Sequence, residues 1–169
     1  MTDRRLHSIA WVIACLLLSA CSSAVRWEPK PAPVVVKTTP SPTSRLSTSI
    51  GASVVKTASR QVGAPYRFGG ASPKGFDCSG LVHYAYRNAG LRVPRTTTSL
   101  YRTARPVSLN ELQLGDILFF YFDDKIGHVA IYTGGRSFVH APSSGKYVVR
   151  GSLESRFWRQ RLVSAGRLY

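Results

Sequence analysis

The order of two hydrophobic patterns constrains the fold of this chain more than any other feature. From about Ile50 to Gly90, apolar residues recur at helical spacing, as in Val54, Ala58 and Val62. Further along, the pattern changes to short apolar runs separated by turn residues: Ile117–Phe122, His128–Tyr132, Ser137–His140, Tyr147–Arg150 and Leu162–Leu168. This order predicts an α+β fold, in which helices pack on one face of an antiparallel sheet of about five strands.

A second helix is expected to begin at Cys78. Asp77 can cap it by accepting a hydrogen bond from a backbone N–H of the first turn, and Gly90 can end it in a left-handed conformation. Cys78 would then lie at the positive end of the helix dipole, which stabilises a thiolate and should lower the pKa of the thiol.

The first residues have the pattern of an export signal. Arg4 and Arg5 precede the apolar stretch Ile9–Leu18, which is short for a membrane span. The following Leu18-Ser19-Ala20-Cys21 resembles the lipobox of bacterial lipoproteins. The resemblance implies that residues 1–20 are a signal peptide, and that acylated Cys21 anchors the mature chain to a membrane without crossing it.

Residues 21–49 are predicted to be the lipidated cysteine and a tether. They are rich in Pro, Ser and Thr, show no sustained hydrophobic period, and contain too few apolar residues to bury a core. A folded domain is expected over residues 50–169. Because Cys15 leaves with the signal peptide and Cys21 is acylated, Cys78 remains as a lone free thiol, so no disulfide is expected within the domain.

The chain is strongly basic, with a formal net charge of +15. Nucleic acid is a frequent partner of such proteins, but an exported, anchored protein meets anionic lipids and carboxylate-rich wall peptides instead. The alternative is a solvated basic surface with no specific partner. We therefore expect no nucleic-acid partner.

Three residues have the chemistry of a thiol hydrolase. Amide hydrolysis by a thiol needs a nucleophile, an imidazole base and a group that orients the base. Cys78 can supply the nucleophile, and His128, at the start of a strand, the base. His140 ends the next strand, and pairing through the turn Gly134-Gly135 would bring the two imidazoles together. The structural alternative is a small buried cysteine at a helix start and a histidine hydrogen-bonded at a sheet edge.

A zinc site is the competing assignment for the same residues. One cysteine and two histidines can ligate zinc, but the spacing lacks a close ligand pair such as Cys-x-x-Cys. His83, five positions after Cys78 in the predicted helix, points away from it and is interpreted as structural.

Six sequence blocks lie along the predicted domain: Tyr66–Gly70, Phe76–Val82, Val93–Thr96, Leu114–Phe120, Gly127–Tyr132 and Phe138–Ala141. In order and spacing, these blocks resemble the NlpC family of cell-wall cysteine peptidases. The resemblance implies a papain-like α+β fold and hydrolysis of amide bonds in peptidoglycan stem peptides or crosslinks. It also implies Cys78 as nucleophile, His128 as base and His140 as the orienting residue, without a metal or cofactor.

The resemblance implies further roles beside the nucleophile. Tyr66 matches a tyrosine that helps to stabilise the oxyanion together with the Cys78 backbone N–H, and a phenol can donate such a hydrogen bond. Asp77 and Ser79 match positions that contact the amine or carboxylate of a stem peptide, although capping is the preferred role for Asp77.

Two other functions are compatible with the same residues. One is a catalytically silent lipoprotein that binds peptidoglycan, and the other is a thiol acyltransferase or amidase on the same fold. The chain is expected to be monomeric. Because Ser22 follows Cys21 in place of an inner-membrane retention aspartate, an outer-membrane location facing the periplasm is expected, or the outer face of the plasma membrane in a one-membrane cell.

Overall fold

The computed structural model describes residues 42–143 and 146–169. The predicted signal peptide, the lipid-modified Cys21 and the predicted tether up to residue 41 lie outside the described residues. Within the described part, no helix combines the length and apolar character that a membrane span requires.

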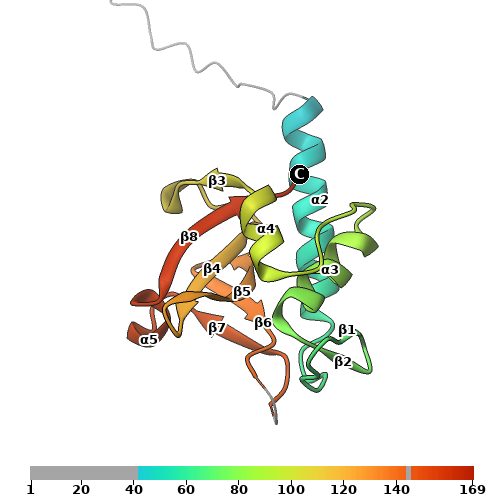
Figure 1. Cartoon of the computed structure of the whole chain (residues 1–169). Coiled ribbons are helices and arrows are strands. Elements are labelled where there is room, and N and C mark those ends of the chain that lie inside the picture. Colours follow the sequence, from blue (N-terminus) through green and yellow to red (C-terminus); the bar gives the residue numbers. More distant parts are fainter. Residues whose placement is uncertain (1–41, 144–145) are drawn as a thin grey trace, which may run out of the picture. The chain divides into compact units, whose positions relative to one another are not determined.

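A six-stranded antiparallel sheet lies at the centre of the described part of the chain (Figure 1). Its strands are β3 (Arg105–Val107), β4 (Ile117–Phe122), β5 (Lys125–Gly134), β6 (Ser137–His140), β7 (Val149–Ser152) and β8 (Leu162–Arg167). Their spatial order is β3-β8-β4-β5-β6-β7. Strands β4 to β7 form a meander, whereas β8 returns to pair with β4 and not with β7. The predicted sheet is confirmed, with β3 as an additional edge strand.

Two of the helices were predicted, and two shorter ones were not. The predicted helices are α2 (Pro42–Ser59) and α3 (Cys78–Asn88), the shorter ones are α4 (Thr97–Thr103) and α5 (Arg156–Arg159), and a 3-10 turn lies at Leu109–Glu111. Helix α2 begins at Pro42, so the prediction of a tether up to residue 49 is wrong for its last residues. A proline fits the first helical turn, because its missing N–H would have no intrahelical partner there. The same helix ends at Ser59, and Val62 lies exposed in the following turn.

Both faces of the sheet are covered, which explains the continuous apolar run in β4. Phe119 and Ile117 belong to a core shared with α2 and α3, whereas Leu118 and Phe120 belong to a second core on the opposite face. Figure 1 shows α2 and α3 on one side of the sheet, where α3 packs against β5. A small hairpin of β1 (Ala71–Ser72) and β2 (Gly75–Phe76) precedes α3.

Asp116 and Arg167 form a buried ion pair. The carboxylate of Asp116, fully buried just before β4, lies 2.7 Å from Nε of Arg167 and accepts a second hydrogen bond from Nη2 of the same arginine at 2.7 Å. Its Oδ2 also accepts a hydrogen bond from the Gln113 backbone N–H. The pair therefore ties the end of β8 to the start of β4.

Candidate active site

The nucleophile candidate lies at the first position of α3. Asp77 adopts an extended conformation before it, and its Oδ1 accepts a hydrogen bond of 2.6 Å from the Gly80 backbone N–H. Gly90 follows the helix with a φ of +85°. The predicted cap and the predicted left-handed stop are both confirmed, and together they define where Cys78 sits.

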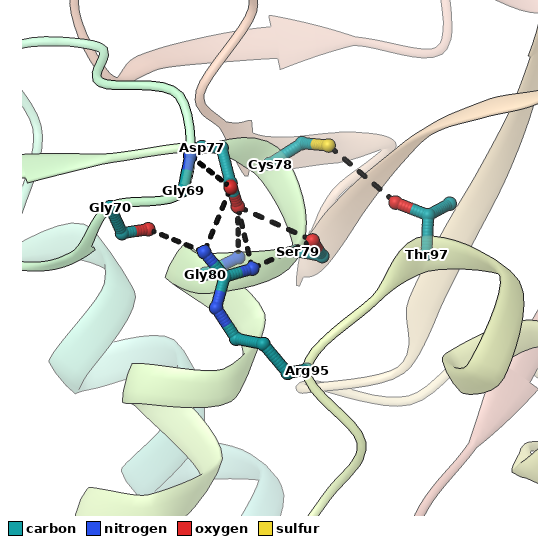
Figure 2. A network of polar contacts seen from close by, with 8 residues as sticks. All are labelled: Gly69, Gly70, Asp77, Cys78, Ser79, Gly80, Arg95 and Thr97. Carbon is teal, nitrogen blue, oxygen red and sulfur yellow. Dashed lines mark hydrogen bonds and ion pairs between the residues drawn. The ribbon is translucent and has the colours of Figure 1, made fainter.

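A network around Asp77 holds this helix start to the preceding loop (Figure 2). Arg95, which comes shortly before α4, donates from Nη1 to Oδ1 at 2.9 Å and from Nη2 to Oδ2 at 2.8 Å. The same arginine donates to Ser79 Oγ and to the Gly70 carbonyl, both at 3.0 Å. Gly69 adds its backbone N–H to Oδ2 at 2.9 Å. No local sequence pattern indicates this role of Arg95, because its partners lie up to 25 residues away.

The network determines the ionisation of Asp77 and occupies Ser79. Burial raises the pKa of Asp77, but the hydrogen bonds and charge of Arg95 and the backbone N–H groups of Gly80 and Gly69 outweigh it, so the pKa lies below its usual value. Ser79 is buried, and its hydroxyl donates to Asp77. Substrate contact by these two side chains stays a prediction.

The Cys78 thiol is half-buried and points to α4 in Figure 2. Its Sγ lies 3.6 Å from the Thr97 hydroxyl oxygen. Burial raises the pKa of the thiol, and the nearby Asp77 carboxylate raises it further, whereas hydrogen bonds from Thr97 and the Val129 and Ser79 backbone lower it. The net shift is upward, so the prediction of a lowered pKa is wrong: desolvation outweighs the favourable helix terminus.

The two predicted histidines are brought together. His128 lies in β5 and His140 ends β6, and His128 Nε2 is 2.9 Å from His140 Nδ1. The rings are nearly perpendicular, at 85°, with centroids 5.0 Å apart. The predicted closeness across the hairpin is therefore confirmed. In the described part of the chain, no hydrogen bond joins either imidazole to Cys78, although β5 packs against the helix that carries the cysteine.

Four aromatic rings surround the histidine pair. We call them the aromatic cage: Phe120, Phe122, Phe138 and Trp158. Trp158, from α5, stacks on His128 at 5.7 Å and meets His140 edge to face at 4.7 Å. Trp158 was not predicted as a site residue, because it follows Phe157 in a basic stretch without a clear hydrophobic period. The pair of adjacent aromatic residues was the one signal in the sequence.

The cage keeps both imidazoles uncharged. Burial lowers the pKa of His128 to about 3, with a further contribution from neighbouring His140. Burial also lowers the pKa of His140 to about 4. With the thiol pKa raised, the cysteine and both histidines are neutral near pH 7 in the free protein.

Tyr66 lies beside the nucleophile in the loop before β1. Its backbone pairs with Phe76 and donates a hydrogen bond of 2.8 Å to the Lys146 carbonyl. Burial raises the pKa of the phenol, and the negative charges of a Cys78 thiolate and of Asp77 raise it further. The phenol therefore keeps its proton near pH 7 and can act as a donor.

The described residues contain no group of three or more His, Cys, Asp or Glu side chains arranged to hold a metal ion. His83 lies apart from the histidine pair, with Nδ1 3.0 Å from the Val93 carbonyl oxygen. Its polar contact is thus with the backbone, as expected for a structural histidine.

Comparisons with known proteins follow the same region. The model of the NlpC/P60 family matches residues 63–167. Among curated proteins, the murein DD-endopeptidase MepH of Escherichia coli strain K12 is 41% identical over 115 residues, which are 64% of this chain and 42% of that protein. The bifunctional muramidase/DL-endopeptidase CwlT of Bacillus subtilis strain 168 is 39% identical over 119 residues, covering 68% of this chain and 36% of that protein.

A solved structure gives the same result for the fold. An NlpC/P60 family protein from Bacillus cereus matches 69% of this chain and 39% of its own with a TM-score of 0.66 and 31% identity. The matched region spans less than half the length of each of these three proteins. The predicted papain-like α+β fold is confirmed by this likeness.

Proposed function

The chain belongs to the NlpC/P60 family, and on this premise we propose that it is a peptidoglycan endopeptidase with Cys78 as its nucleophile. The single observation that carries the thiol mechanism is the 2.9 Å contact between His128 Nε2 and His140 Nδ1. This contact engages one nitrogen of His128 and leaves its Nδ1 for a proton transfer with the thiol.

Relatives support the reaction class but differ in the bond. The name of MepH specifies a DD-endopeptidase, and that of CwlT a DL-endopeptidase. Both names describe cleavage within peptides that contain D-amino acids. The proposal therefore covers the bond between D-glutamate and the diamino acid of the stem as well as the D-amino-acid crosslink.

The orientation of the base follows from its hydrogen bond. For Nδ1 of His128 to accept a proton, its Nε2 must carry the ring hydrogen and donate it to Nδ1 of His140. His140 then holds both the tautomer and the ring plane of His128. The Cys78 thiol also has a backbone hydrogen bond with Val129, the residue that follows His128 in β5.

The reaction proceeds from a neutral pair. Nδ1 of His128 takes the thiol proton as Sγ attacks the substrate carbonyl carbon, and the oxyanion accepts hydrogen bonds from the Cys78 backbone N–H and the Tyr66 hydroxyl. Collapse breaks the amide bond, and protonated His128 gives its proton to the leaving amine. Water then attacks the thioester with His128 as base, which releases the carboxylic acid and restores the thiol.

The anchored location is a second element of the proposal. The lipobox-like Leu18-Ser19-Ala20-Cys21 motivates export and acylation of Cys21, which would hold the peptidase at a membrane next to its substrate. With Ser22 after the cysteine, the outer membrane facing the periplasm is proposed. In the native host, the wild-type chain should be found in the membrane fraction and the Cys21→Ser variant in the soluble fraction. A variant that stays in the membrane fraction would contradict anchoring through this cysteine.

Digestion of purified peptidoglycan by the detergent-solubilised full-length chain tests the activity. Wild type should release peptide fragments that mass spectrometry assigns to a single bond type, whereas Cys78→Ser and His128→Ala should release none while remaining folded. His140→Ala should retain activity reduced on the order of 10²-fold, because the base loses its orientation but not its proton affinity. Activity in folded Cys78→Ser would refute the nucleophile assignment.

The same digestion distinguishes the alternative functions. A folded wild type that binds peptidoglycan without releasing fragments would favour a silent binding protein. Products that incorporate an added amine in preference to water would favour an acyltransferase, since both attack the same thioester.

A further inference from the structure

A cavity lies between the end of α4 and the strands β3, β4 and β8. It has a volume of about 390 Å³, and we call it the α4 cavity. Its lining includes Tyr101, Arg102, Ala104, Pro106, Phe119 and Ser164, from α4, β3, β4 and β8. None of the roles assigned above uses this cavity.

The walls of the α4 cavity are aromatic and small. The ring of Tyr101 is 42% exposed and meets Phe119 edge to face, with centroids 5.1 Å apart. Gly166 in β8 belongs to the same lining and is closely packed, because a Cβ there would lie 2.6 Å from the Ala104 Cβ and 3.5 Å from Phe119. Arg102 is the charged residue of the lining, so the cavity suits a neutral or weakly anionic ligand.

One polar group of the lining lacks a partner. Ser164 Oγ is buried, and within residues 42–143 and 146–169 it has no hydrogen-bond partner. A buried hydroxyl without a partner is costly, and such groups in native proteins need an explanation. Because Ser164 belongs to the lining of the cavity, a ligand amide bound there can both donate to its hydroxyl and accept from it.

Contacts along α4 and across the sheet both indicate that the α4 cavity lies close to the nucleophile. Along α4, Tyr101 follows Thr97, the partner of Cys78 Sγ, by one helical turn of about 6 Å on the same face. Across the sheet, Ser164 pairs with Phe119, and Phe119 pairs with Val129, whose backbone N–H contacts the Cys78 thiol. Ser164 and Val129 are therefore two strand spacings apart, about 10 Å. Two or three residues of an extended peptide span this distance.

We propose that the α4 cavity is a subsite for an N-acetylated sugar of the glycan strand that carries the stem peptide. The inference rests on the proposed endopeptidase function. The Tyr101 ring can stack on the apolar C–H face of a pyranose, the small apolar wall can receive the acetyl methyl group, and Ser164 can bond the acetamido group. The volume of the α4 cavity is much larger than an alanine methyl group would fill, and a sugar ring fits into it.

Paired substrates test the subsite in the full-length chain. One substrate is a crosslinked muropeptide that retains its disaccharides, and the other is the same crosslinked peptide after an amidase has removed the sugars. Tyr101→Ala and Ser164→Ala should each raise KM for the sugar-bearing substrate about fivefold. Both should leave cleavage of the sugar-free peptide within twofold of wild type.

Tyr121→Ala is the matched control, because it removes a tyrosine of similar exposure, 44%, outside the cavity lining. It should leave KM for both substrates unchanged. Equal losses on the two substrates would overturn the sugar subsite, since the cavity would then serve the peptide or the fold. Unchanged KM in both cavity variants would overturn it as well. Failure of wild type to cleave either substrate would instead refute the endopeptidase function on which the inference rests.

Discussion

Replacing Asp77 by asparagine should destabilise the start of α3 without changing its shape. Oδ2 of Asp77 accepts hydrogen bonds from the Gly69 N–H at 2.9 Å and from Arg95 Nη2 at 2.8 Å (Figure 2). In Asp77→Asn, an NH₂ group replaces this oxygen if Oδ1 continues to cap Gly80. The Gly69 N–H and Arg95 Nη2 would then face the NH₂ group, which is itself a hydrogen-bond donor. Arg95 would also lose the negative charge of its partner.

The magnitude follows from these contacts. Hydrogen bonds to charged groups contribute about 1.5–3 kcal/mol, but Arg95 is 33% exposed and can recover some of the loss from water. We therefore expect the free energy of unfolding to fall by about 2 kcal/mol, which for a domain of this size corresponds to a Tm lower by roughly 6–8 °C. Because the folded pKa of Asp77 is lowered, this contribution is complete above the unfolded pKa of about 3.9. Measurement at pH 7 therefore captures all of it.

Urea unfolding at pH 7 of wild type, Asp77→Asn, Arg95→Gln and the double variant measures the coupling directly. A coupling energy of about 1 kcal/mol or more is expected between the two side chains. Asp124→Asn is the matched control, because the same chemical change in an exposed turn should stay within about 0.5 kcal/mol. A coupling energy near zero, or an equal loss in the control, would refute the role of the carboxylate charge. Folded Asp77→Asn should also have a reduced kcat, since Cys78 follows the cap directly.

Two further predictions concern stability. Asp116→Asn should lower the free energy of unfolding by about 3 kcal/mol, because Arg167, only 10% exposed, keeps a buried charge without a partner; a loss below 1 kcal/mol in urea unfolding would contradict this. The pKa values of His128 and His140 are lowered in the folded protein to about 3 and 4, so below pH 6.5 the unfolded chain binds more protons than the folded one. The contribution of the two neutral histidines to the free energy of unfolding is therefore fully present above pH 6.5 and decreases as the pH falls towards the folded pKa values. Between pH 7 and pH 5 the loss should be about 2 kcal/mol per histidine, from 1.36 kcal/mol per pH unit, and His140→Asn should lose a smaller amount; stability that is constant or rises over this range would contradict the burial argument.

Features encoded by neighbouring residues were predictable. Asp77 before Cys78 and Gly90 after the helix specify its two ends, because caps act within one turn. The pairing that joins His128 to His140 depends on a short hairpin turn, so the two imidazoles could be placed together before the fold was known. Periodicity likewise predicted the strands with buried side chains.

Features that depend on distant contacts were not predictable. The edge strand β3 has exposed arginine and proline side chains, so its position depends on backbone pairing with β8 and not on a hydrophobic pattern. Placement of β8 beside β4 is likewise a long-range pairing. Trp158 reaches the histidines only because α5 folds back over the second core.

Local sequence patterns were enough to predict the family, the order of most helices and strands, the cap of α3 and the three residues proposed for catalysis. The protonation of these three residues depends on the folded structure. A helix N-terminus favours a thiolate locally, yet the pKa of Cys78 is raised and those of the two histidines are lowered, because burial depends on every element packed around a group. Desolvation is a property of the assembled core, which no stretch of neighbouring residues encodes.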